Sequence, residues 1–334
     1  MTDLPPHVRM LNLCTSNWIS QSIYAAAKLG LADLVEKGPQ TSEELAKVTG
    51  THAPSLYRLL RALASIGIFV EDGGRRFGLT PLAECLLSRP GSQRSMCIMA
   101  GEEHYAAWGD ILHSIRTGGV AFDHVVGKPI FEFLKEHPEQ AAIFDDAMTG
   151  VHGAETQAMI DAYDFSGIGT LVDIGGGNGT VLKAVLEKYP AMKGMLYDLG
   201  HVLDRARPAI QNSPLSSRCQ LIAGSFFESI PAGGDAYLMR HIIHDWTDEQ
   251  CHTILSHCRK VMKQGSKLLV VEMVILPGNN RHFGKLLDLN MMIVPGGKER
   301  TEEEYRSLFA KAGFRLTRVV PTRMELCVVE GVPD

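Results

Sequence analysis

The stretch "LVDIGGGNGTVLKAVLEKYP", residues Leu171 to Pro190, places a glycine-rich turn between a short apolar run and a helical pattern. Glycine fills four of the five positions 175–179. A turn that joins a strand to a helix in this way lies at the carboxyl edge of an open α/β sheet, where such sheets bind ligands. The free N–H groups and the positive end of the helix dipole favour an anionic group there, either a phosphate or an α-carboxylate.

The next predicted strand ends at Asp198 in "LYDL". A carboxylate at that position can accept hydrogen bonds from both hydroxyls of a ribose, so NAD, FAD and S-adenosylmethionine (SAM) are the candidate ligands. The spacing is G-x-G-x-G, at Gly175, Gly177 and Gly179, which fits the dinucleotide pattern G-x-G-x-x-G poorly. A purely structural turn in an unrelated α/β protein remains an open alternative.

Residues from about 166 onward alternate between strand and helix patterns. Short apolar runs bounded by turn residues predict five strands and, after them, two strands joined by "PTR". An alternating order predicts a parallel sheet with crossover helices, and the final pair predicts an antiparallel hairpin. The predicted strands cover residues 170–174, 193–199, 219–224, 235–240 and 266–275, followed by 314–320 and 324–331.

The first hundred residues predict helices and a small hairpin. One helix is expected over residues 21–38, a second over 41–50 with a capping box formed by Thr41 or Ser42 and Glu44, and a third over 53–68. Two short strands around Gly-Gly follow in residues 69–80. This order is that of a winged helix-turn-helix, which either binds DNA or serves as a packing and dimerisation unit. The few cations there, Arg58 and Arg61 on the third helix and Arg75 and Arg76 in the wing, argue against DNA binding.

The amino-acid composition bears on the number of domains, on nucleic-acid binding and on the location of the protein. The chain has 334 residues, enough for two domains, with 45% hydrophobic and 21% charged residues and a formal net charge of −5, which argues against nucleic acid as a partner. Seven cysteines, an odd number without a C-x-x-C, predict reduced thiols and a cytoplasmic protein. The N-terminal residues lack a signal-peptide core, and no uncharged apolar run is long enough to cross a bilayer.

Four motifs occur in the order in which they are found in one known family: "LVDIGGGNG", "LYDLGHVLDRA", "GSFFESIPAGGDAYLMRHIIHDWTDEQC" and "PGGKERTEEEYRSLFAKAGF". Over nearly the whole chain the sequence resembles the SAM-dependent O-methyltransferases of small aromatic hydroxyls, such as caffeate, hydroxyindole, phenazine and polyketide methyltransferases. The resemblance implies an α/β fold, a seven-stranded Rossmann-like sheet with an N-terminal winged-helix dimerisation domain, and a homodimer. We expect the dimerisation domain in residues 1–100, a helical connector with acceptor-site helices in 101–165, and the SAM-binding catalytic domain in 166–334.

The resemblance also implies a set of cofactor-binding residues. Gly175 and Gly177 would lie beside the methionine part of SAM, Asp198 would bind the ribose, and Phe226 would lie against the adenine. Arg240 stands where the family has a Lys or Arg near the cofactor. Ser225 is a departure, since the family usually has an Asp there to accept from the adenine amino group, and a hydroxyl accepts without charge assistance.

For the chemistry, the resemblance implies that His244 is the general base, with Glu272 and Glu299 as the carboxylates that flank it. A carboxylate on the far ring nitrogen fixes the tautomer and favours the imidazolium that forms. His241, His244, Asp245 and Asp248 could instead be viewed as a metal cluster, but the family chemistry is metal-independent, and Asp245 is expected to cap the next helix. The acceptor site would be lined by Trp108, Phe144, Met148, Asn290 and Met291.

The sequence therefore predicts a metal-independent SAM-dependent O-methyltransferase that methylates a phenolic or enolic hydroxyl of a small aromatic substrate. Two alternatives remain. The same fold could catalyse a SAM-assisted decarboxylation or hydroxylation, or the winged helix could make the protein a SAM-responsive DNA-binding regulator. Neither a nucleic acid nor a membrane is expected as a partner.

Overall fold

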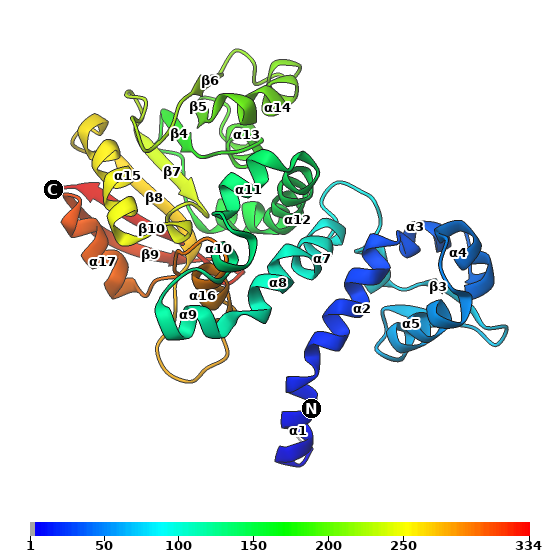
Figure 1. Cartoon of the computed structure of the whole chain (residues 1–334). Coiled ribbons are helices and arrows are strands. Elements are labelled where there is room, and N and C mark those ends of the chain that lie inside the picture. The colour runs from blue at the N-terminus through cyan, green and yellow to red at the C-terminus, as the bar shows by residue number, and fades with distance from the viewer. Residues whose placement is uncertain (1–3) are drawn as a thin grey trace. The chain divides into compact units, whose positions relative to one another are not determined.

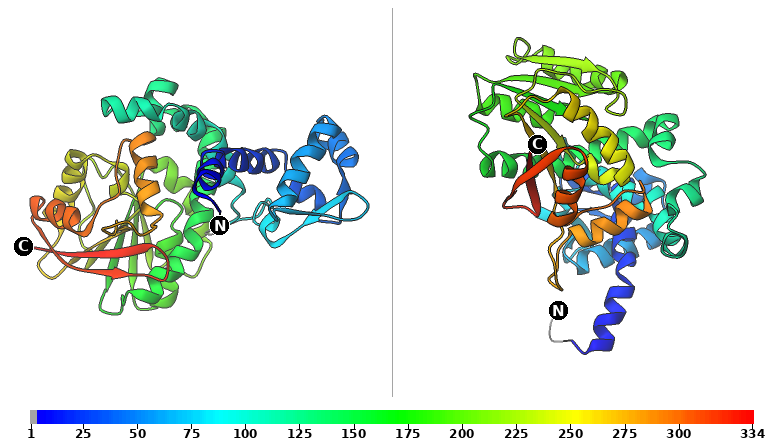
Figure 2. Two further views of the ribbon diagram at one scale, coloured as in Figure 1. Left: turned by 90° about the horizontal axis from the view of Figure 1, so that it is seen from below. Right: turned by 90° about the vertical axis from the view of Figure 1, so that its left-hand side faces the viewer.

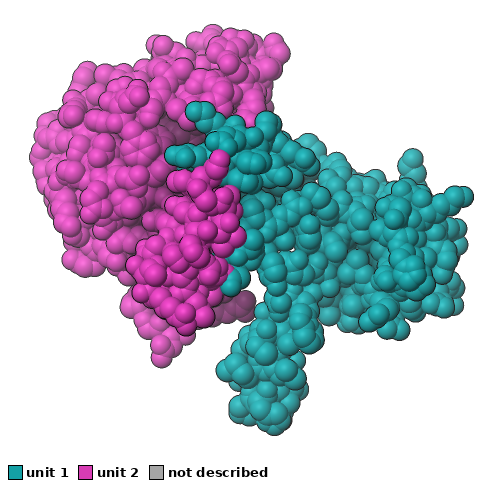
Figure 3. All heavy atoms as spheres, in the orientation of Figure 1, with its two compact units in different colours: residues 1–109, 131–152 teal, residues 110–130, 153–334 magenta. Residues whose placement is uncertain are grey.

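The computed structural model describes residues 4–334, apart from the side chains of residues 151, 152 and 154. The chain forms two compact units, coloured separately in Figure 3. Unit 1 comprises residues 1–109 and 131–152, and unit 2 comprises residues 110–130 and 153–334. The two are described here one at a time.

Unit 2 is built on a seven-stranded sheet with the strand order β6-β5-β4-β7-β8-β10-β9. The pairs from β6 through β8 are parallel, while β10 runs antiparallel to both β8 and β9. The antiparallel pair closes one edge of the sheet in red in Figure 2. The strands are β4 (Thr170–Ile174), β5 (Lys193–Asp198), β6 (Cys219–Ala223), β7 (Ala236–Arg240), β8 (Lys267–Met273), β9 (Phe314–Pro321) and β10 (Leu326–Pro333).

Alternating strand residues bury both faces of this sheet. On β4, Leu171 packs into the core that covers one face, and Val172 packs into the core on the other face. Helices α13 and α14 and the end of α12 contribute to the first core, and helices α15 and α17 to the second (Figure 1). The central strands β4, β7 and β8 are buried over almost their whole length and are largely apolar, as expected of parallel strands covered on both faces.

The helices of unit 2 begin where the sequence provides caps. Thr247 and Thr301 each form a capping box with the residue three positions further on, which starts α15 and α17. The helices are α9 (Ile111–Thr117), α10 (Ala121–Val126), the C-terminal part of α12 (Pro138–Ala162), α13 (Thr180–Lys188), α14 (Gly200–Gln211), the 3₁₀ turn η1 (Ile243–Asp245), α15 (Asp248–Val261), α16 (Gly284–Ile293) and α17 (Glu302–Lys311).

Unit 1 is mainly helical and contains the expected order of helices and hairpin. Its small sheet has the order β1-β3-β2, where β1 is a two-residue strand that the sequence did not reveal. Its elements are α1 (Pro6–Cys14), α2 (Ser16–Lys28), α3 (Leu31–Val35), β1 (Gln40–Thr41), α4 (Ser42–Thr49), α5 (Ala53–Ser65), β2 (Phe69–Glu71), β3 (Arg76–Leu79), α6 (Pro81–Glu84), α7 (Arg94–Gly101), α8 (Glu103–Gly109), α11 (Ile130–Glu136) and the first part of α12.

Two segments that were predicted to be helical are interrupted. The helix expected over residues 21–38 is divided into α2 and α3 at Gly30, whose φ of 65° is left-handed and ends a right-handed helix. The helical connector expected in residues 101–165 is likewise interrupted, since α8 ends at Gly109 and α9 begins at Ile111. The capping box of Thr41 and Glu44 was predicted correctly. The fold class, a seven-stranded α/β sheet with an N-terminal helical unit, is confirmed.

The surface of α1 and α2 is unusually apolar. Leu13 and Trp18 are 67% and 68% exposed, and Met10, Leu11 and Ile19 are exposed beside them. The ring of Tyr57 on α5 lies under two guanidinium groups, that of Arg61 on the same helix and that of Arg75 in the turn between β2 and β3. Within the described residues, no helix combines the length and apolar character of a membrane span.

Candidate active site

The glycine turn joins β4 to α13 at the carboxyl edge of the parallel strands. Gly175 has a φ of 66°, and a Cβ at this position would lie 2.5 Å from Cδ1 of Ile242. Gly177 has a φ of 58°, and its N–H donates to Oδ2 of Asp198 at 2.8 Å. The positive φ values favour glycine at both positions, and at Gly175 the close approach of Ile242 also leaves little room for a Cβ. The turn therefore lies directly against the segment that follows β7.

Asp198, at the end of β5, faces this turn. Its second oxygen, Oδ1, accepts the N–H of Leu199 at 2.7 Å. Burial raises the pKa of this carboxyl, while the two backbone donors, Gly177 and Leu199, lower it. Each oxygen has a further lone pair, so the carboxylate retains the capacity to accept a ribose diol.

Asp173 is a buried acid beneath the turn that sequence reasoning missed. It is 1% exposed, and its Oδ2 has no hydrogen-bond partner among the described residues. Burial raises its pKa to about 7, although the charge of Arg240 opposes this. An acid with an unsatisfied oxygen at this edge fits a ligand that brings N–H donors, as the amino-acid part of SAM does. Its position inside an apolar strand had concealed it in the sequence.

Of the remaining predicted cofactor residues, Phe226 lies beside the same turn, Ser225 precedes Phe226 in the chain, and Arg240 ends the neighbouring strand β7. The ring of Phe226 lies 3.5 Å from the position that a Cβ of Gly175 would take. The hydroxyl of Ser225 accepts the N–H of Phe227 at 3.3 Å. Arg240 ends β7 and donates to Oγ1 of Thr156 at 2.7 Å, and burial lowers the pKa of its guanidinium. The glycine turn, the carboxylate of Asp198 and the ring of Phe226 therefore lie together at one edge of the sheet.

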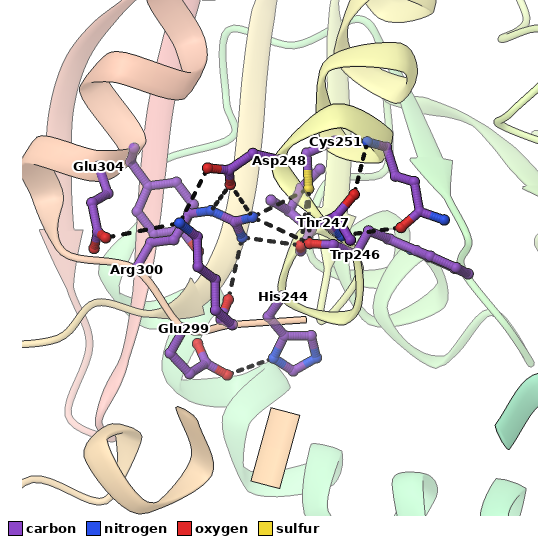
Figure 4. Close-up of polar contacts among 12 residues, drawn as sticks. His244, Trp246, Thr247, Asp248, Cys251, Glu299, Arg300 and Glu304 are labelled. Atoms are coloured by element: carbon purple, nitrogen blue, oxygen red, sulfur yellow. Dashed lines mark hydrogen bonds and ion pairs between the residues drawn. The ribbon is translucent and has the colours of Figure 1, made fainter. Parts of the chain in front are cut away.

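His244 lies in η1, just beyond β7, and its ring is held by a carboxylate. Nδ1 is 2.6 Å from Oε1 of Glu299, and the two side chains are 8% and 0% exposed. Figure 4 shows the Glu299 carboxylate directed at this ring nitrogen. The N–H on Nδ1 donates a hydrogen bond to the carboxylate, so in the neutral ring the lone pair is on Nε2. This is how a carboxylate orients a histidine that acts as a base.

Glu272, at the end of β8, reaches the backbone of His244 and not its ring. Oε1 accepts the N–H groups of His244 at 3.1 Å and of Ile242 at 3.2 Å. Oε2 accepts the hydroxyl of Tyr305, a buried residue of α17 that sequence reasoning did not select. The structure therefore separates the two carboxylates: Glu299 orients the imidazole, and Glu272 fixes the turn that carries it.

Asp245 is a third acid at the histidine. Its Oδ1 is 3.5 Å from Nε2 of His244, and burial raises the pKa of Asp245 to about 6 while the imidazole lowers it. The expectation that Asp245 caps the following helix was wrong, because Thr247 is the N-cap of α15. For His244, burial lowers the pKa, but Asp245, Glu299 and Glu272 together raise it to about 10.

Arg300 stabilises the turn around His244 and was also missed. Its fully buried guanidinium donates to the carbonyls of Ile243 and Trp246 at 3.1 and 3.2 Å, and to Oδ1 of Asp248 at 2.8 Å. Figure 4 shows this fork linking the segment after α16 to the start of α15. Its position next to Glu299, in a loop far along the chain, gave no local sign of this role.

The predicted acceptor residues are distributed over three helices. Trp108 on α8 and Phe144 and Met148 on α12 belong to unit 1, and all three are partly exposed. Asn290 and Met291 on α16 belong to unit 2, where Met291 is buried.

Among the described residues, one group has the spacing of a metal cluster: Asp110, His113 and His124, which lies outside the turn at His244. The two imidazole rings are stacked with centroids 4.1 Å apart and planes only 5° from parallel. A metal ion lies close to the plane of each histidine that binds it, and two stacked parallel planes do not meet at one ion. This arrangement is that of stacked rings tied to a carboxylate, with Nδ1 of His124 2.6 Å from Asp110.

The parallel sheet that ends in an antiparallel hairpin, the glycine turn after β4 and the carboxylate of Asp198 at the end of β5 are the features of the class of SAM-dependent methyltransferases. Comparison with known families then places the chain within this class. The family model of the O-methyltransferase domain matches residues 108–315, and that of the O-methyltransferase dimerisation domain matches residues 11–89. The chain belongs to this O-methyltransferase family, and the predicted enzyme class and its cofactor, SAM, are confirmed.

The relatives include both O- and N-methyltransferases. The chain is 44% identical to a phenazine O-methyltransferase of Lysobacter antibioticus, over 97% of this chain and 95% of that protein. It is 31% identical to a phenazine-1-carboxylate N-methyltransferase of Pseudomonas aeruginosa, over 95% and 94%. The crystal structure of an O-methyltransferase from neocarzinostatin biosynthesis, in complex with SAM and 2-hydroxy-5-methyl naphthoic acid, matches with a TM-score of 0.84 and 32% identity, over 95% and 96% of the two chains.

Proposed function

We propose that this enzyme methylates a phenolic or enolic hydroxyl of a small aromatic compound, with His244 as the general base and without a metal ion. The observation that carries the proposal is the buried pair of His244 and Glu299 at the edge of the sheet that also holds the glycine turn and Asp198. SAM supplies an activated methyl group on a sulfonium. The residues of this chain must therefore align the acceptor oxygen and accept its proton.

The raised pKa of His244 suits a phenolic acceptor. A phenol has a pKa of about 10, so at neutral pH only about one molecule in a thousand is ionised. The carboxylates around His244 raise its pKa to about 10 as well, so the phenol and the imidazole bind the transferred proton with similar affinity. Nε2 accepts the proton, and Glu299 on Nδ1 stabilises the imidazolium that results.

The hydrogen bonds of these groups support a metal-independent reaction. The ring of His244 is bound to Glu299, and both oxygens of Glu272 accept N–H or O–H donors. Nδ1 of His244, Oε1 of Glu299 and both oxygens of Glu272 therefore have partners within the protein and do not need a metal ion to satisfy them. For the cofactor, we assign the turn at Gly175 and Gly177 to the methionine part, Asp198 to the ribose and Phe226 with Ser225 to the adenine, with Arg240 close to them.

We further propose that the protein acts as a homodimer through unit 1. The match of residues 11–89 to a dimerisation domain and the exposed apolar side chains of α1 and α2 support this. In this reading the winged-helix elements pack and do not bind DNA, in agreement with the stacking of Arg61 and Arg75 on Tyr57. The cytoplasmic location inferred from the cysteines stays a prediction.

Transfer of a labelled methyl group from SAM to matched aromatic acceptors tests the function directly. Hydroxynaphthalenes and hydroxyphenazines are compared with the corresponding aminonaphthalenes and aminophenazines, and each product is assigned by mass spectrometry and NMR. We expect O-methyl ethers and unchanged rates after treatment with EDTA. Products methylated only at nitrogen would contradict the O-specific proposal, and a loss of activity with EDTA that returns with Mg²⁺ would contradict metal independence.

A further inference from the structure

The turn that carries His244 is held through its N–H groups by one buried carboxylate. Oε1 of Glu272 accepts the N–H of His244 at 3.1 Å and that of Ile242 at 3.2 Å. The side chain of Glu272 is fully buried near the end of β8. A buried carboxylate needs hydrogen-bond donors at both of its oxygens, because water does not reach it. The contact at the other oxygen, Oε2, therefore helps to decide whether Glu272 keeps this orientation.

Tyr305 supplies the donor for Oε2. Its hydroxyl donates to this oxygen from the first turn of α17, and its side chain is fully buried as well. Burial raises the pKa of Tyr305 well above its usual value, and the charges of Glu272 and Glu299 raise it further. The hydroxyl therefore keeps its proton and remains a donor, so that both oxygens of Glu272 face donors.

The chain segment that leads to Tyr305 also binds the carbonyls of the same turn. The N–H of Lys298 donates to the carbonyl of His244 at 2.9 Å, and Arg300 donates to the carbonyl of Ile243 at 3.1 Å. The capping box of Thr301 then fixes the start of α17. Residues 298–305 thus bind the turn at its carbonyls directly and at its N–H groups through Glu272.

A second buried tyrosine–glutamate pair provides a comparison within unit 2. The hydroxyl of Tyr163 donates to Oε2 of Glu330 at 2.5 Å, and Arg318 forms an ion pair with the same oxygen at 2.9 Å. Neither residue of this pair contacts the turn at His244 in the described part of the chain. Glu272, in contrast, is contacted there by uncharged donors alone, so an ion pair does not compensate for the loss of one of them.

We propose that Tyr305 is a positioning residue for the proton-accepting histidine: its hydroxyl fixes the carboxylate of Glu272, which fixes the backbone of the turn and hence the ring of His244. Without the hydroxyl, Oε2 has no donor in a fully buried site, and the carboxylate turns toward other donors or takes up a proton. In both cases the N–H groups of the turn lose a charged acceptor in the right place. This inference rests on the proposed function, because it assigns a residue that supports the proposed base.

The test is Tyr305→Phe, which removes the hydroxyl and keeps the ring. The matched control is Tyr163→Phe, which removes the same group from the other buried tyrosine–glutamate pair. The first measurement is the NMR signal of the backbone amide protons of Ile242 and His244 in the complex with S-adenosylhomocysteine. An amide proton that is bonded to a carboxylate resonates at low field, because charge-assisted hydrogen bonds are short and strong. The second measurement is methyl transfer to 2-naphthol.

We expect Tyr305→Phe to move both amide signals to higher field and to lower kcat about tenfold, as the loss of one hydrogen bond to a charged group allows. KM for SAM and for 2-naphthol should remain within about twofold of the parent, since the hydroxyl binds neither of them. Tyr163→Phe should leave the amide signals and kcat unchanged.

A double-mutant cycle separates action through Glu272 from a general loss of packing. In Glu272→Gln, the hydroxyl of Tyr305 no longer acts on a charged group. Adding Tyr305→Phe to this variant should therefore lower kcat by less than about twofold. An equal loss in both backgrounds overturns the inference, because the hydroxyl would then act independently of Glu272.

Unchanged amide signals or an unchanged kcat in Tyr305→Phe also overturn the inference. So does an equal loss in Tyr163→Phe, because the effect would then be that of any buried hydroxyl. If the parent transfers no methyl group to any phenol, the amide signals still decide this inference, and the proposed function alone is contradicted.

Discussion

His244 is held at two points, by Glu299 at its ring and by Glu272 at its backbone N–H. The two carboxylates therefore make different contributions to catalysis. Glu299 contacts the imidazole and stabilises its positive charge directly, while Glu272 adds to this charge effect from further away and mainly determines where the imidazole lies. Substitution of either residue by glutamine should separate these contributions, since an amide still accepts a hydrogen bond but no longer stabilises a positive charge.

Removal of the proposed base should act on turnover and spare the cofactor. We expect His244→Ala to lower kcat by about 10²–10⁴, the usual contribution of general acid–base catalysis, with SAM affinity within a few-fold of the parent. The loss should shrink for acidic phenols that are already ionised. Rate constants against phenols of graded acidity measure this. A parental rate on a weakly acidic phenol would end the hypothesis, and an equal loss at every acidity would leave His244 only an orienting role.

The pH dependence follows from the raised pKa of His244. With 2-naphthol, kcat/KM of the parent should increase with pH well above 7, because the free imidazole is formed only as the pH approaches about 10. Glu299→Gln should move the rise toward lower pH, since loss of a neighbouring negative charge lowers the pKa of the histidine. A parent profile that is already flat above pH 7.5 would contradict the expected shift.

At the scale of elements, the site depends on the junction between β7 and α15. Arg300 binds two carbonyls and one carboxylate of this junction. Arg300→Lys keeps the charge but loses the fork, so we expect a loss of about 1–3 kcal/mol in the free energy of unfolding and a lower kcat. Denaturant unfolding measures the first effect.

Lys298→Ala is the matched control for Arg300, because Lys298 contacts the same Asp248 but is 40% exposed. An exposed ion pair contributes about 0.2–1 kcal/mol, so this variant should remain close to the parent in stability and in kcat. Equal effects of the two substitutions would show that only the charge at Asp248 matters and that the junction does not need the fork.

The turn after β4 and the end of β5 form the proposed cofactor-binding element, in which the N–H of Gly177 donates to Asp198. Asp198→Ala should weaken SAM binding by about 1.5–3 kcal/mol, the range for hydrogen bonds to a charged group. Asp204→Ala on α14, whose side chain is 73% exposed, should leave the affinity unchanged. Calorimetry measures the SAM affinity of each protein. An Asp198→Ala protein with the parental SAM affinity would show that this residue does not bind the cofactor.

At the scale of the whole molecule, the apolar surface of α1 and α2 requires a partner. Leu13→Glu together with Trp18→Glu should convert a dimer into monomers, because a charge buried in an interface without a partner is strongly unfavourable. Val48→Glu, on the equally exposed surface of α4, is the control. Light scattering reports the mass, and turnover reports whether the monomer is active. A double variant that remains dimeric would place the interface elsewhere.

The sequence by itself determined the class of fold, the glycine turn and the place of Asp198, because periodicity, capping and motif spacing are local properties of the chain. His244 was selected through the resemblance of the motif around it to the O-methyltransferase family. It did not determine which glutamate reaches the imidazole. The contacts His244–Glu299, Arg300–Ile243 and His241–Glu155 join residues 55, 57 and 86 positions apart, so the packing of whole elements had to bring them together. The burial of Asp173 is of the same kind, because the environment of a side chain is created by its neighbours in space and leaves no mark on the residues beside it in the chain.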